Sequence, residues 1–567
     1  MDKFISQTDS SLKKKKRRWK PKGRQVENLF YDEVSTLFQG MSFKRDELIE
    51  YFHILQDKFG VLYDKHLVAL SMIINLPLSE IYEVATFYAH FNIVKNSETY
   101  EPLKTVRVCE SLTCELFGAK KLLSDLKKNE NKNIKVVPGP CMGRCDVAPT
   151  VCVGKNYVDK ASLKTVEEAL KNKNFDVVIP DYISLDDYRK DGGYKISNQI
   201  KKGEIQNTKI IEYLKESGLK GKGGAGFPTG MKWEIVSKYN GTKYVAVNGD
   251  EGEPGTFKDR KYLETDPHRF LEGALIASLF IKATNVYIYM RDEYPSVIQI
   301  LNDEILKLEK ENIIPKGHFI LRRGAGAYIC GEESAMIESI EGKRGLPRHR
   351  PPYVAEMGLF NAPTLTNNLE TLFWIRDIIE KGPNWFSEKG IDGKKGFHSF
   401  SVSGRVKNPG VKVAPAGITI QQLIDDYCGG IEDDHVFKGY LPGGASGGIL
   451  PASMNNIPLD YGSKELTDTG CFLGSAAIVV LSDKDNMKDV ALNLLKFFEE
   501  ESCGQCTPCR AGTEKTVKLM KEKIWNKEKL SDLSEVMSQA SICGLGQAAT
   551  NPLNSVLKYF EKEISYE

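Results

Sequence analysis

The sequence is poor in histidine and contains no long apolar run. Only eight histidines occur among 567 residues, and no two of them are spaced i, i+4, so we do not expect a histidine-based metal centre. No run of about 18 apolar residues occurs, so no membrane-spanning helix is predicted. The chain does not open with the charged and then apolar pattern of a secretory signal peptide.

A large charge excess of either sign is also absent. The net charge of +2 argues against an overall field for nucleic acid or acidic lipid. We interpret the basic run Lys13–Arg18 as part of a solvated, disordered tail, although such a run can also hold nucleic acid or an acidic membrane surface. With 41% apolar and 27% charged residues, the composition is that of a globular chain of about three or four domains.

Cysteine, in contrast, is concentrated. Of the twelve cysteines, eight fall into two groups of four with ligand-like spacing. This clustering suits metal sites in a reducing compartment better than a disulfide framework, so we expect the protein to be cytoplasmic.

The C-terminal group consists of Cys503, Cys506 and Cys509, each separated by two residues, and the later Cys543. Thiolates are soft ligands that suit an iron–sulfur cluster or zinc. Zinc modules usually arrange their ligands as two separated pairs, whereas three in a run plus one remote cysteine is typical of a [4Fe–4S] site. The alternative is a set of unrelated buried thiols.

The N-terminal group consists of two pairs, each at the end of an expected strand. Cys109 and Cys114 follow a strand at 105–108, and Cys141 and Cys145 follow a strand at 134–137. Four thiolates at these spacings suit a [2Fe–2S] cluster, with zinc as the competing interpretation. Cys152 lies within a strand pattern and is expected in the core.

Between the cysteine groups lies an α/β region with two glycine-rich loops. Residues 221–230 satisfy G-x-G-x-x-G, but an expected helix precedes them and Pro228 interrupts them, so this is not the usual dinucleotide fingerprint. A backbone with few side chains still lets amide N–H groups approach a phosphate or a flat ring, and Lys232 could supply a charge to that phosphate. The second such loop spans 324–333.

Polar residues follow the expected strands of this region. Asn248, Asp250, Glu251 and Glu253 come after a buried strand at 243–247, which is typical of a ligand loop in an open parallel sheet; the alternative is a solvated acidic turn. The adjacent Asn367 and Asn368 offer donors and acceptors to a polar ring edge.

At these motifs the chain resembles a known family. Residues 221–233, 248–260, 324–333 and 503–512 resemble the NADH-oxidising flavoprotein subunit of respiratory complex I, and 76–91 with the first four cysteines resemble that complex's small thioredoxin-like [2Fe–2S] subunit. The fusion of both in one chain is similar to the diaphorase subunits of soluble NAD-dependent formate dehydrogenases and NAD-reducing hydrogenases. Residues 22–25 and 140–149 look closest to the formate dehydrogenase beta chain.

The resemblance implies a multidomain α/β and α+β architecture. The expected parts are a basic tail (1–25), a helical bundle (26–98), a thioredoxin-like [2Fe–2S] domain (104–170), a linker (171–203), a Rossmann-like FMN- and NAD-binding domain (204–390), a small ubiquitin-like α+β domain of the SLBB type (395–475) and a helical [4Fe–4S] domain (486–567).

The resemblance also assigns site residues. The residues expected to contact FMN or the dinucleotide are Gly221, Gly223, Gly224, Gly226, Phe227, Lys232, Asn248, Asp250, Glu251, Tyr328, Gly331, Glu332, Arg350, Tyr353, Asn367 and Asn368. Glu253 and Glu333 are the candidate catalytic residues beside the dinucleotide. The family often has Lys and Phe where this chain has Arg350 and Tyr353, and its last cluster ligand usually lies farther downstream than Cys543.

The implied reaction is hydride exchange between NAD(H) and FMN, followed by single-electron exchange with one [4Fe–4S] and one [2Fe–2S] cluster. Glu333 near the ribose would favour NAD over NADP. The expected partners are a molybdenum or tungsten formate dehydrogenase alpha subunit and small accessory subunits. A hydrogenase and a complex I-like quinone reductase are the alternatives, and a zinc-stabilised nucleic-acid-binding protein is a distant one.

Overall fold

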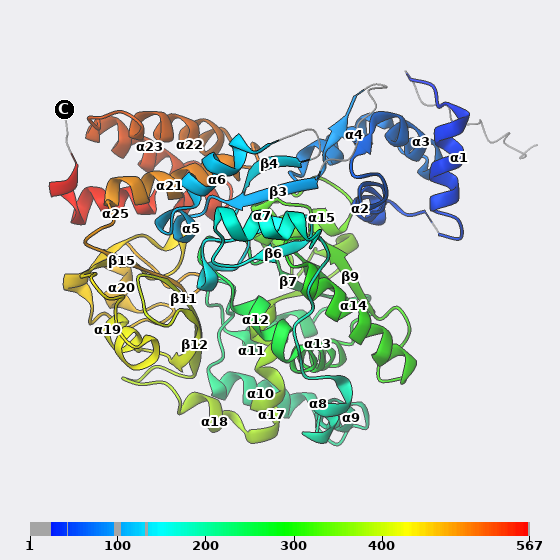
Figure 1. The fold of residues 1–567 in the computed structure, drawn as a ribbon. Coiled ribbons are helices and arrows are strands. Elements are labelled where there is room, and N and C mark those ends of the chain that lie inside the picture. The colour runs from blue at the N-terminus through cyan, green and yellow to red at the C-terminus, as the bar shows by residue number, and fades with distance from the viewer. Residues whose placement is uncertain (1–23, 42, 96–103, 131–133, 565–567) are drawn as a thin grey trace, which may run out of the picture. The chain divides into compact units, whose positions relative to one another are not determined.

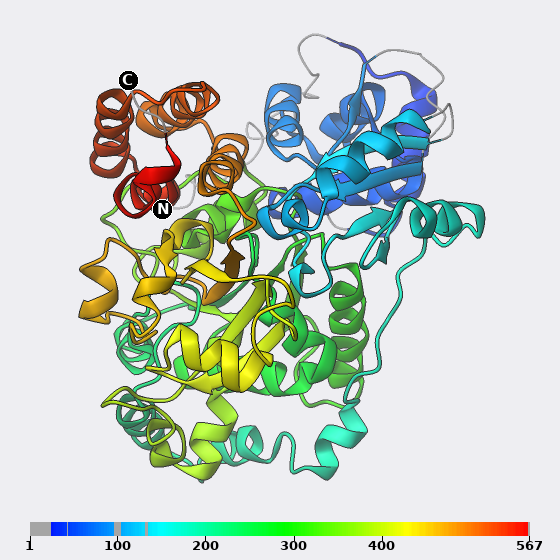
Figure 2. The same cartoon turned by 60° about the vertical axis from the view of Figure 1, so that its left-hand side comes forward.

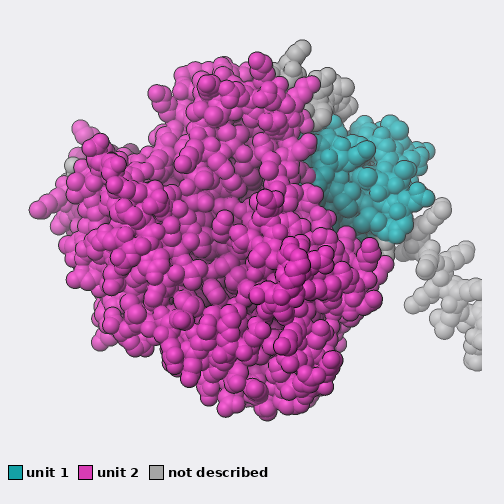
Figure 3. All heavy atoms as spheres, turned by 60° about the horizontal axis from the view of Figure 1, so that its bottom comes forward, with its two compact units in different colours: residues 1–87, 91–100 teal, residues 88–90, 101–567 magenta. Residues whose placement is uncertain are grey.

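The computed structural model describes residues 24–41, 43–95, 104–130 and 134–564. The chain divides into two compact units, one of residues 1–87 and 91–100, the other of residues 88–90 and 101–567 (Figure 3). The basic run Lys13–Arg18 lies outside the described residues. In the described ranges, no helix has the length and apolar character needed to cross a membrane.

The first unit is the expected helical bundle. Its elements are α1 (Asn28–Leu37), α2 (Leu48–Phe59), α3 (Asp64–Ile74), α4 (Leu78–Phe87) and a short parallel pair of strands, β1 (Leu62–Tyr63) and β2 (Ile93–Val94). The prediction of Ser79 as the N-cap of the last helix is wrong, because α4 already begins at Leu78, directly after Pro77. The same helix ends at Phe87 rather than near His90.

The second unit begins with the predicted thioredoxin-like domain. Its elements are β3 (Lys104–Cys109), α5 (Leu112–Leu116), α6 (Ala119–Lys128), β4 (Ile134–Gly139), β5 (Val151–Val153), β6 (Asn156–Val158) and α7 (Leu163–Lys171). The strands have the order β4-β3-β5-β6, with β3 parallel to β4 and antiparallel to β5. Alternate residues of β3, Val106 and Val108, are fully buried and form the core with Leu126 of α6 and Val166 of α7.

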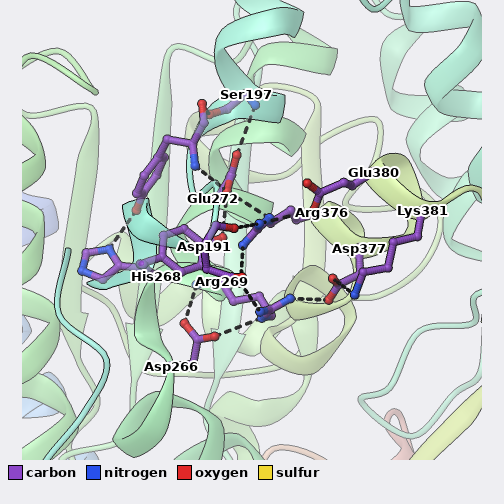
Figure 4. A network of polar contacts seen from close by, with 12 residues as sticks. Asp191, Ser197, Asp266, His268, Arg269, Glu272, Arg376, Asp377, Glu380 and Lys381 are labelled. Carbon is purple, nitrogen blue, oxygen red and sulfur yellow. Dashed lines mark hydrogen bonds and ion pairs between the residues drawn. The ribbon is translucent and has the colours of Figure 1, made fainter. Parts of the chain in front are cut away.

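The segment predicted as a linker, 171–203, differs from that prediction in its second half. An extended stretch leads from α7 to two helices, α8 (Leu185–Lys190) and α9 (Lys195–Lys201) (Figure 2). Tyr188 and Tyr194 are buried among the core residues of the following domain. The fully buried Glu272 accepts hydrogen bonds from the Tyr188 hydroxyl (2.7 Å) and from the backbone N–H groups of Tyr194 (2.8 Å) and Ser197 (3.2 Å) (Figure 4). These helices are therefore part of the α/β domain.

The α/β domain is built on a four-stranded sheet in which every pairing is parallel. Its elements are α10 (Asn207–Ser217), α11 (Thr229–Ser237), β7 (Tyr244–Gly249), α12 (Lys258–Thr265), α13 (Pro267–Ile281), β8 (Asn285–Met290), α14 (Pro295–Lys310), β9 (Phe319–Arg323), α15 (Glu333–Ile340), β10 (Thr364–Asn368), α16 (Leu369–Phe373), α17 (Ile375–Lys381) and α18 (Pro383–Ser387). The strand order is β10-β7-β8-β9. As expected, Asp266 caps α13 by accepting a bond from the Arg269 N–H, and Pro267 occupies the first turn.

A small α+β domain follows, with strands β11 (Phe397–Gly404), β12 (Gly410–Pro415), β13 (Phe437–Leu441), β14 (Leu450–Pro451) and β15 (Ala477–Ser482). The strand order is β12-β11-β15-β13-β14. Since β15 lies between β11 and β13, the sheet extends to Ser482 and not to the predicted boundary at 475. The apolar run at 476–481 predicts a strand, which β15 confirms one residue later in the chain, but its pairing with β11, about 76 residues earlier, depends on the tertiary fold.

The C-terminal part is helical, as predicted. It comprises α21 (Met487–Glu500), α22 (Thr507–Met520), α23 (Lys527–Ala540), α24 (Gly544–Ala548) and α25 (Asn551–Tyr559). These helices pack together beside the small α+β domain (Figures 1 and 2).

Candidate cofactor sites

The four cysteines of the N-terminal group lie together inside the protein. Cys109 ends β3, Cys114 lies in α5, and Cys141 and Cys145 flank the loop after β4. Each is at most 3% exposed. The Sγ atoms of Cys141 and Cys145 are 3.5 Å apart. Hydrogen bonds from Cys109 and Cys145 hold the pKa of the Cys141 thiol well below its usual value, while hydrogen bonds within the group raise the pKa of Cys109 and Cys145.

Groups from the α/β domain complete this site. Phe257 packs on Cys141 and Cys145. The buried Arg291, which directly follows β8, donates to the backbone carbonyl of Cys141 (2.6 Å) and adds positive charge beside its thiol. A cation at this position stabilises the negative charge that thiolates and a cluster bring into a buried site.

Gly143, between the second pair of cysteines, is required by sterics. Its φ is +63°, and a Cβ at this position would lie 2.0 Å from the hydroxyl oxygen of Tyr294. The carbonyl of Gly143 accepts a bond from Arg260 Nε (2.8 Å). The loop therefore lies directly on the α/β domain, with no room for a larger residue.

The C-terminal cysteine group is assembled at helix ends. Cys506 is the N-cap of α22 and Cys543 is the N-cap of α24. Burial, followed by the neighbouring thiols of Cys503 and Cys509, raises the pKa of Cys543 to about 11, while the N–H groups of residues 545 and 546 oppose this rise. The structure thus brings the remote Cys543 to the cysteine run, as the sequence predicts. Cys503, Cys506 and Cys543 are partly exposed, and Cys509 is buried.

Each cysteine group offers four thiols, which is the number of protein ligands that a [2Fe–2S] or a [4Fe–4S] cluster takes. An iron–sulfur cluster places inorganic sulfide and several irons between its cysteine ligands, and so it needs a wider cage than a single ion does.

The first glycine-rich loop, 219–228, connects α10 to α11 and lies at the end of the parallel sheet. Gly223 faces Asn368, since a Cβ on Gly223 would lie 3.1 Å from the Cβ of Asn368. Gly226 has a φ of +64°, and its Cβ would meet the ring of Tyr461 at 2.8 Å. Glycine is therefore required at these two positions, and the absence of side chains leaves backbone N–H groups accessible to a ligand.

Polar side chains lie at the carboxyl ends of β7 and β10. Asn248 and Asn368 are register neighbours on these parallel strands. Asp250 Oδ2 and Asn368 Oδ1 are buried and have no hydrogen-bond partner among the described residues. Burial raises the pKa of Asp250 well above its usual value, and Arg291 opposes this only in part. Orphaned polar atoms beside a glycine-rich cradle fit a ligand with hydroxyl groups and a polar ring edge, as FMN has. Asn367 instead accepts a bond from Trp233 Nε1 (3.0 Å).

Lys232 of α11 points toward the same region. Its Nζ donates to Thr366 Oγ1 (2.7 Å) and Glu333 Oε2 (3.1 Å), and Arg350 lies 3.2 Å from the other oxygen of Glu333. Burial alone would raise the pKa of Glu333, but Lys232, Thr366 and Arg350 together lower it, so this carboxylate is charged. Glu332, in contrast, caps α15 through the N–H groups of its first turn.

The remaining predicted residues divide into exposed and internal ones. Phe227 is 46% exposed and Tyr353 57% exposed, so both rings are accessible to a ligand. Glu253 is turned inward, and its Oε1 accepts bonds from the Ser446 N–H (2.8 Å) and hydroxyl (2.5 Å). Glu251 accepts from the N–H groups of Asp259 and Arg260 at the start of α12. Thus Glu251 and Glu253 hold loops in this structure. The carbonyl of Gly331 accepts a bond from Asn248 Nδ2 (2.7 Å), the N–H of Gly221 donates to the Phe227 carbonyl (2.8 Å), and the ring of Tyr328 packs on Phe497.

Sequence reasoning missed the residues that connect the three sites. Arg291 Nη1 donates to the carbonyl of Glu251 in the flavin loop (2.5 Å) while its Nη2 donates to Cys141. On the other side, the backbone N–H of Tyr328 donates to Glu501 Oε2 (2.9 Å), two residues before Cys503. The sequence feature that could have identified Arg291 is its position just after a buried strand, at the sheet edge where ligands bind.

Comparisons with known proteins identify the domains. Residues 34–174 match the family model for the thioredoxin-like [2Fe-2S] ferredoxin, residues 214–377 that for the Nuo51 FMN-binding domain, and residues 489–567 that for the NADH-ubiquinone oxidoreductase-F iron-sulfur binding region. These matches confirm the predicted fold class and the predicted FMN, NAD(H), [2Fe–2S] and [4Fe–4S] cofactors.

Individual relatives agree. The chain is 40% identical over 403 residues to the second F-type subunit of the NADH-quinone oxidoreductase of Rhizobium meliloti, a match that covers 68% of this chain and 95% of that protein. It is 39% identical over 395 residues to the F-type NADH-quinone oxidoreductase subunit of Aquifex aeolicus, covering 67% and 90%. A chain in the crystal structure of an NAD+-reducing [NiFe]-hydrogenase in the H2-reduced state is 26% identical, with a TM-score of 0.80, and the match covers 92% of this chain and 93% of that one.

Proposed function

The chain belongs to the family of F-type NADH-quinone oxidoreductase subunits, and we propose that it exchanges hydride with NAD(H) and single electrons with a partner protein, as the diaphorase of a larger complex. One observation carries this proposal. The loops that hold both cysteine groups are hydrogen-bonded directly to loops of the flavin site, through Arg291 on one side and Glu501 on the other. Such contiguity is what electron exchange between cofactors in one chain requires.

When bound, FMN supplies the chemistry that links two-electron exchange with nicotinamide to one-electron exchange with clusters. The contribution of the protein is to bind and orient. The glycine-rich loop and Lys232 would bind the phosphate. The unpaired oxygens of Asp250 and Asn368 would form hydrogen bonds with the flavin. Phe227 and Tyr353 would cover the dinucleotide.

Glu333 is proposed to select NAD over NADP. Its carboxylate is charged and lies beside Lys232 and Arg350, so a 2′-phosphate nearby would be repelled while a ribose hydroxyl could be accepted. We expect Glu333→Ala to increase the NADPH/NADH ratio of kcat/KM by roughly tenfold or more. Glu338→Ala, on the same helix but bonded to Arg348, is the matched control. An unchanged ratio in Glu333→Ala would refute this role.

As the partner protein, we propose a hydrogen-activating [NiFe] module. We prefer it to the formate dehydrogenase alpha subunit that the sequence motifs at 22–25 and 140–149 suggest. The support is the shared fused organisation, since the similarity to the chain of the NAD+-reducing hydrogenase extends over 92% of this chain. The matches to subunits of NADH-quinone oxidoreductases cover only about two thirds of this chain, so they do not share its fused organisation over the full length. A complex I-like assembly is the second candidate, supported by the higher identity to those relatives.

The test is an anaerobic native pull-down of the full chain from its own cells, with metal analysis and activity assays. Nickel together with hydrogen-dependent NAD+ reduction would support the hydrogenase partner. Molybdenum or tungsten with formate-dependent NAD+ reduction would instead restore the formate dehydrogenase assignment. A preparation that contains zinc and no flavin, iron or acid-labile sulfide would refute the diaphorase function itself.

We also propose a cytoplasmic location, because a reducing compartment keeps the eight grouped cysteines as thiols.

A further inference from the structure

The turn between α23 and α24 contains a serine whose hydroxyl is unused. Ser541 is 6% exposed, and its Oγ has no hydrogen-bond partner in the described ranges. Its backbone is satisfied, since its N–H donates to the Met537 carbonyl (3.2 Å) and its carbonyl accepts from Gln547 Nε2 (3.0 Å). Only the hydroxyl of this residue is left without a function in the fold.

Ser541 lies against the C-terminal cysteine group. A Cβ placed on Gly546 would be 2.5 Å from Ser541 Oγ and 2.9 Å from the Cβ of Cys509, so both side chains converge on the same point at the start of α24. The N–H of Gly546 bonds to the thiol of Cys543, which follows Ser541 by two residues. The unused hydroxyl and the side chain of Cys509 therefore lie against the same residue, Gly546, whose N–H bonds to Cys543.

A buried hydroxyl without a partner at such a place indicates a missing acceptor. Buried polar groups are nearly always paired in folded proteins. The same site already shows this kind of contact, because Ser502 Oγ lies 3.3 Å from Cys509 Sγ. An iron–sulfur cluster would add further sulfur acceptors in the space that the cysteines enclose.

We propose that Ser541 donates a hydrogen bond to a sulfur atom of the [4Fe–4S] cluster and thereby raises the electron affinity of that cluster. The inference rests on the proposed function only in that the cluster is present. A hydrogen bond to cluster sulfur stabilises the reduced form, which carries one more negative charge, more than the oxidised form. Ser541 thus tunes the cluster through which electrons leave or enter the flavin.

Ser534 provides a matched control. It lies in α23, is 5% exposed, and its hydroxyl also lacks a partner among the residues described. Ser534 precedes Ser541, the residue directly after α23, by seven positions, which corresponds to about 10 Å along a helix. If unpartnered hydroxyls in this domain act only through general packing, both serines should behave alike.

The experiment is an anaerobic redox titration of the full-length chain with its clusters, monitored by electron paramagnetic resonance. Ser541→Ala should reduce the electron affinity of the [4Fe–4S] cluster about tenfold, which is a midpoint potential about 59 mV lower for one electron. The midpoint of the [2Fe–2S] signal in the same sample should not change. Ser534→Ala should leave both midpoints at the wild-type values.

Ser541→Thr and Ser541→Val separate the hydroxyl from the shape of the side chain, and they keep the test decisive if the alanine variant is unstable. The threonine variant should retain the higher potential and the valine variant should not. Equal midpoints in these two variants, or a wild-type midpoint in Ser541→Ala, would overturn the inference while leaving the diaphorase function intact. The absence of any [4Fe–4S] signal from the loaded wild-type protein would overturn both.

Discussion

The two cysteine groups use the same ligand in opposite surroundings. Cys109, Cys114, Cys141 and Cys145 are at most 3% exposed and are enclosed by a sheet, a helix and side chains of the α/β domain. Three of the C-terminal cysteines are partly exposed, at the ends of helices in a small bundle. The first site thus depends on several side chains of another domain, whereas the contacts of the second come from backbone N–H groups and hydroxyls of its own helices, apart from the Tyr328–Glu501 hydrogen bond to the α/β domain.

The surroundings of each cysteine group determine which changes the site tolerates. A buried site gains stability and a low dielectric from its surroundings, and it requires a compensating charge, which Arg291 supplies. A partly exposed site is better placed to meet a partner protein, because electron exchange between proteins needs a cluster near the surface. The predictions below test whether this contrast holds.

The largest effect is expected from Cys543→Ser. Since loss of second-shell partners alone reduces metal affinity or activity 10- to 100-fold, loss of a ligand should abolish the [4Fe–4S] signal and reduce electron transfer to the partner by at least about 100-fold. NADH-dependent reduction of a small dye should persist, because that reaction needs only the flavin. Both activities and the iron content are to be measured.

Cys471→Ser is the control for this prediction. Cys471 is buried, its thiol lies 3.7 Å from Ser555 Oγ, and it belongs to neither cysteine group. Its substitution should leave the iron content unchanged. Retention of the [4Fe–4S] signal in Cys543→Ser would show that another residue completes the site.

A smaller effect is expected on folding stability, which should differ between alanine substitutions of the two glycines beside the cysteine groups. Gly143→Ala places a Cβ 2.0 Å from Tyr294 Oη at a φ of +63°, and it should destabilise the folded protein by about 1–3 kcal/mol. Gly544→Ala, next to Cys543, meets no described atom within 4 Å and should change stability by less than about 1 kcal/mol. Denaturant unfolding of both variants measures this. Equal destabilisation would contradict the contrast between an enclosed and an open site.

The smallest effect concerns chemical lability. In air-exposed protein, the [4Fe–4S] signal should disappear severalfold faster than the [2Fe–2S] signal, since oxidants reach partly exposed cysteines first. The decay of the two paramagnetic signals, followed in one sample after reduction, provides the comparison. Faster loss of the [2Fe–2S] cluster would show that burial does not protect it.

The spacing of residues in the sequence allowed much of the C-terminal cysteine group and of the flavin site to be predicted. The Cys-x-x-Cys-x-x-Cys run predicts three ligands, and Cys543 is predicted as the fourth because no later cysteine exists in the sequence. The strand ends that carry Asn248 and Asn368 were also predicted, since parallel strands present their carboxyl ends at one edge.

What could not be predicted depends on distant segments. The polar composition of 171–203 concealed Tyr188 and Tyr194, which are buried in the core of the α/β domain and bond to Glu272, about 80 residues later, through the Tyr188 hydroxyl and the Tyr194 backbone N–H. Likewise, the role of Arg291 requires the Cys141 loop to lie on the α/β domain, and no periodicity encodes that contact.

The most direct test of the account is an anaerobic titration of the purified, cluster-loaded chain with NADH, monitored by visible absorption and electron paramagnetic resonance. We predict that NADH bleaches the flavin and produces two distinct cluster signals, of which only the [4Fe–4S] signal is lost in Cys543→Ser. If NADH reduces the flavin but neither cluster, or if both cysteine groups contain zinc, the claim that one flavin serves two iron–sulfur sites in this chain is contradicted.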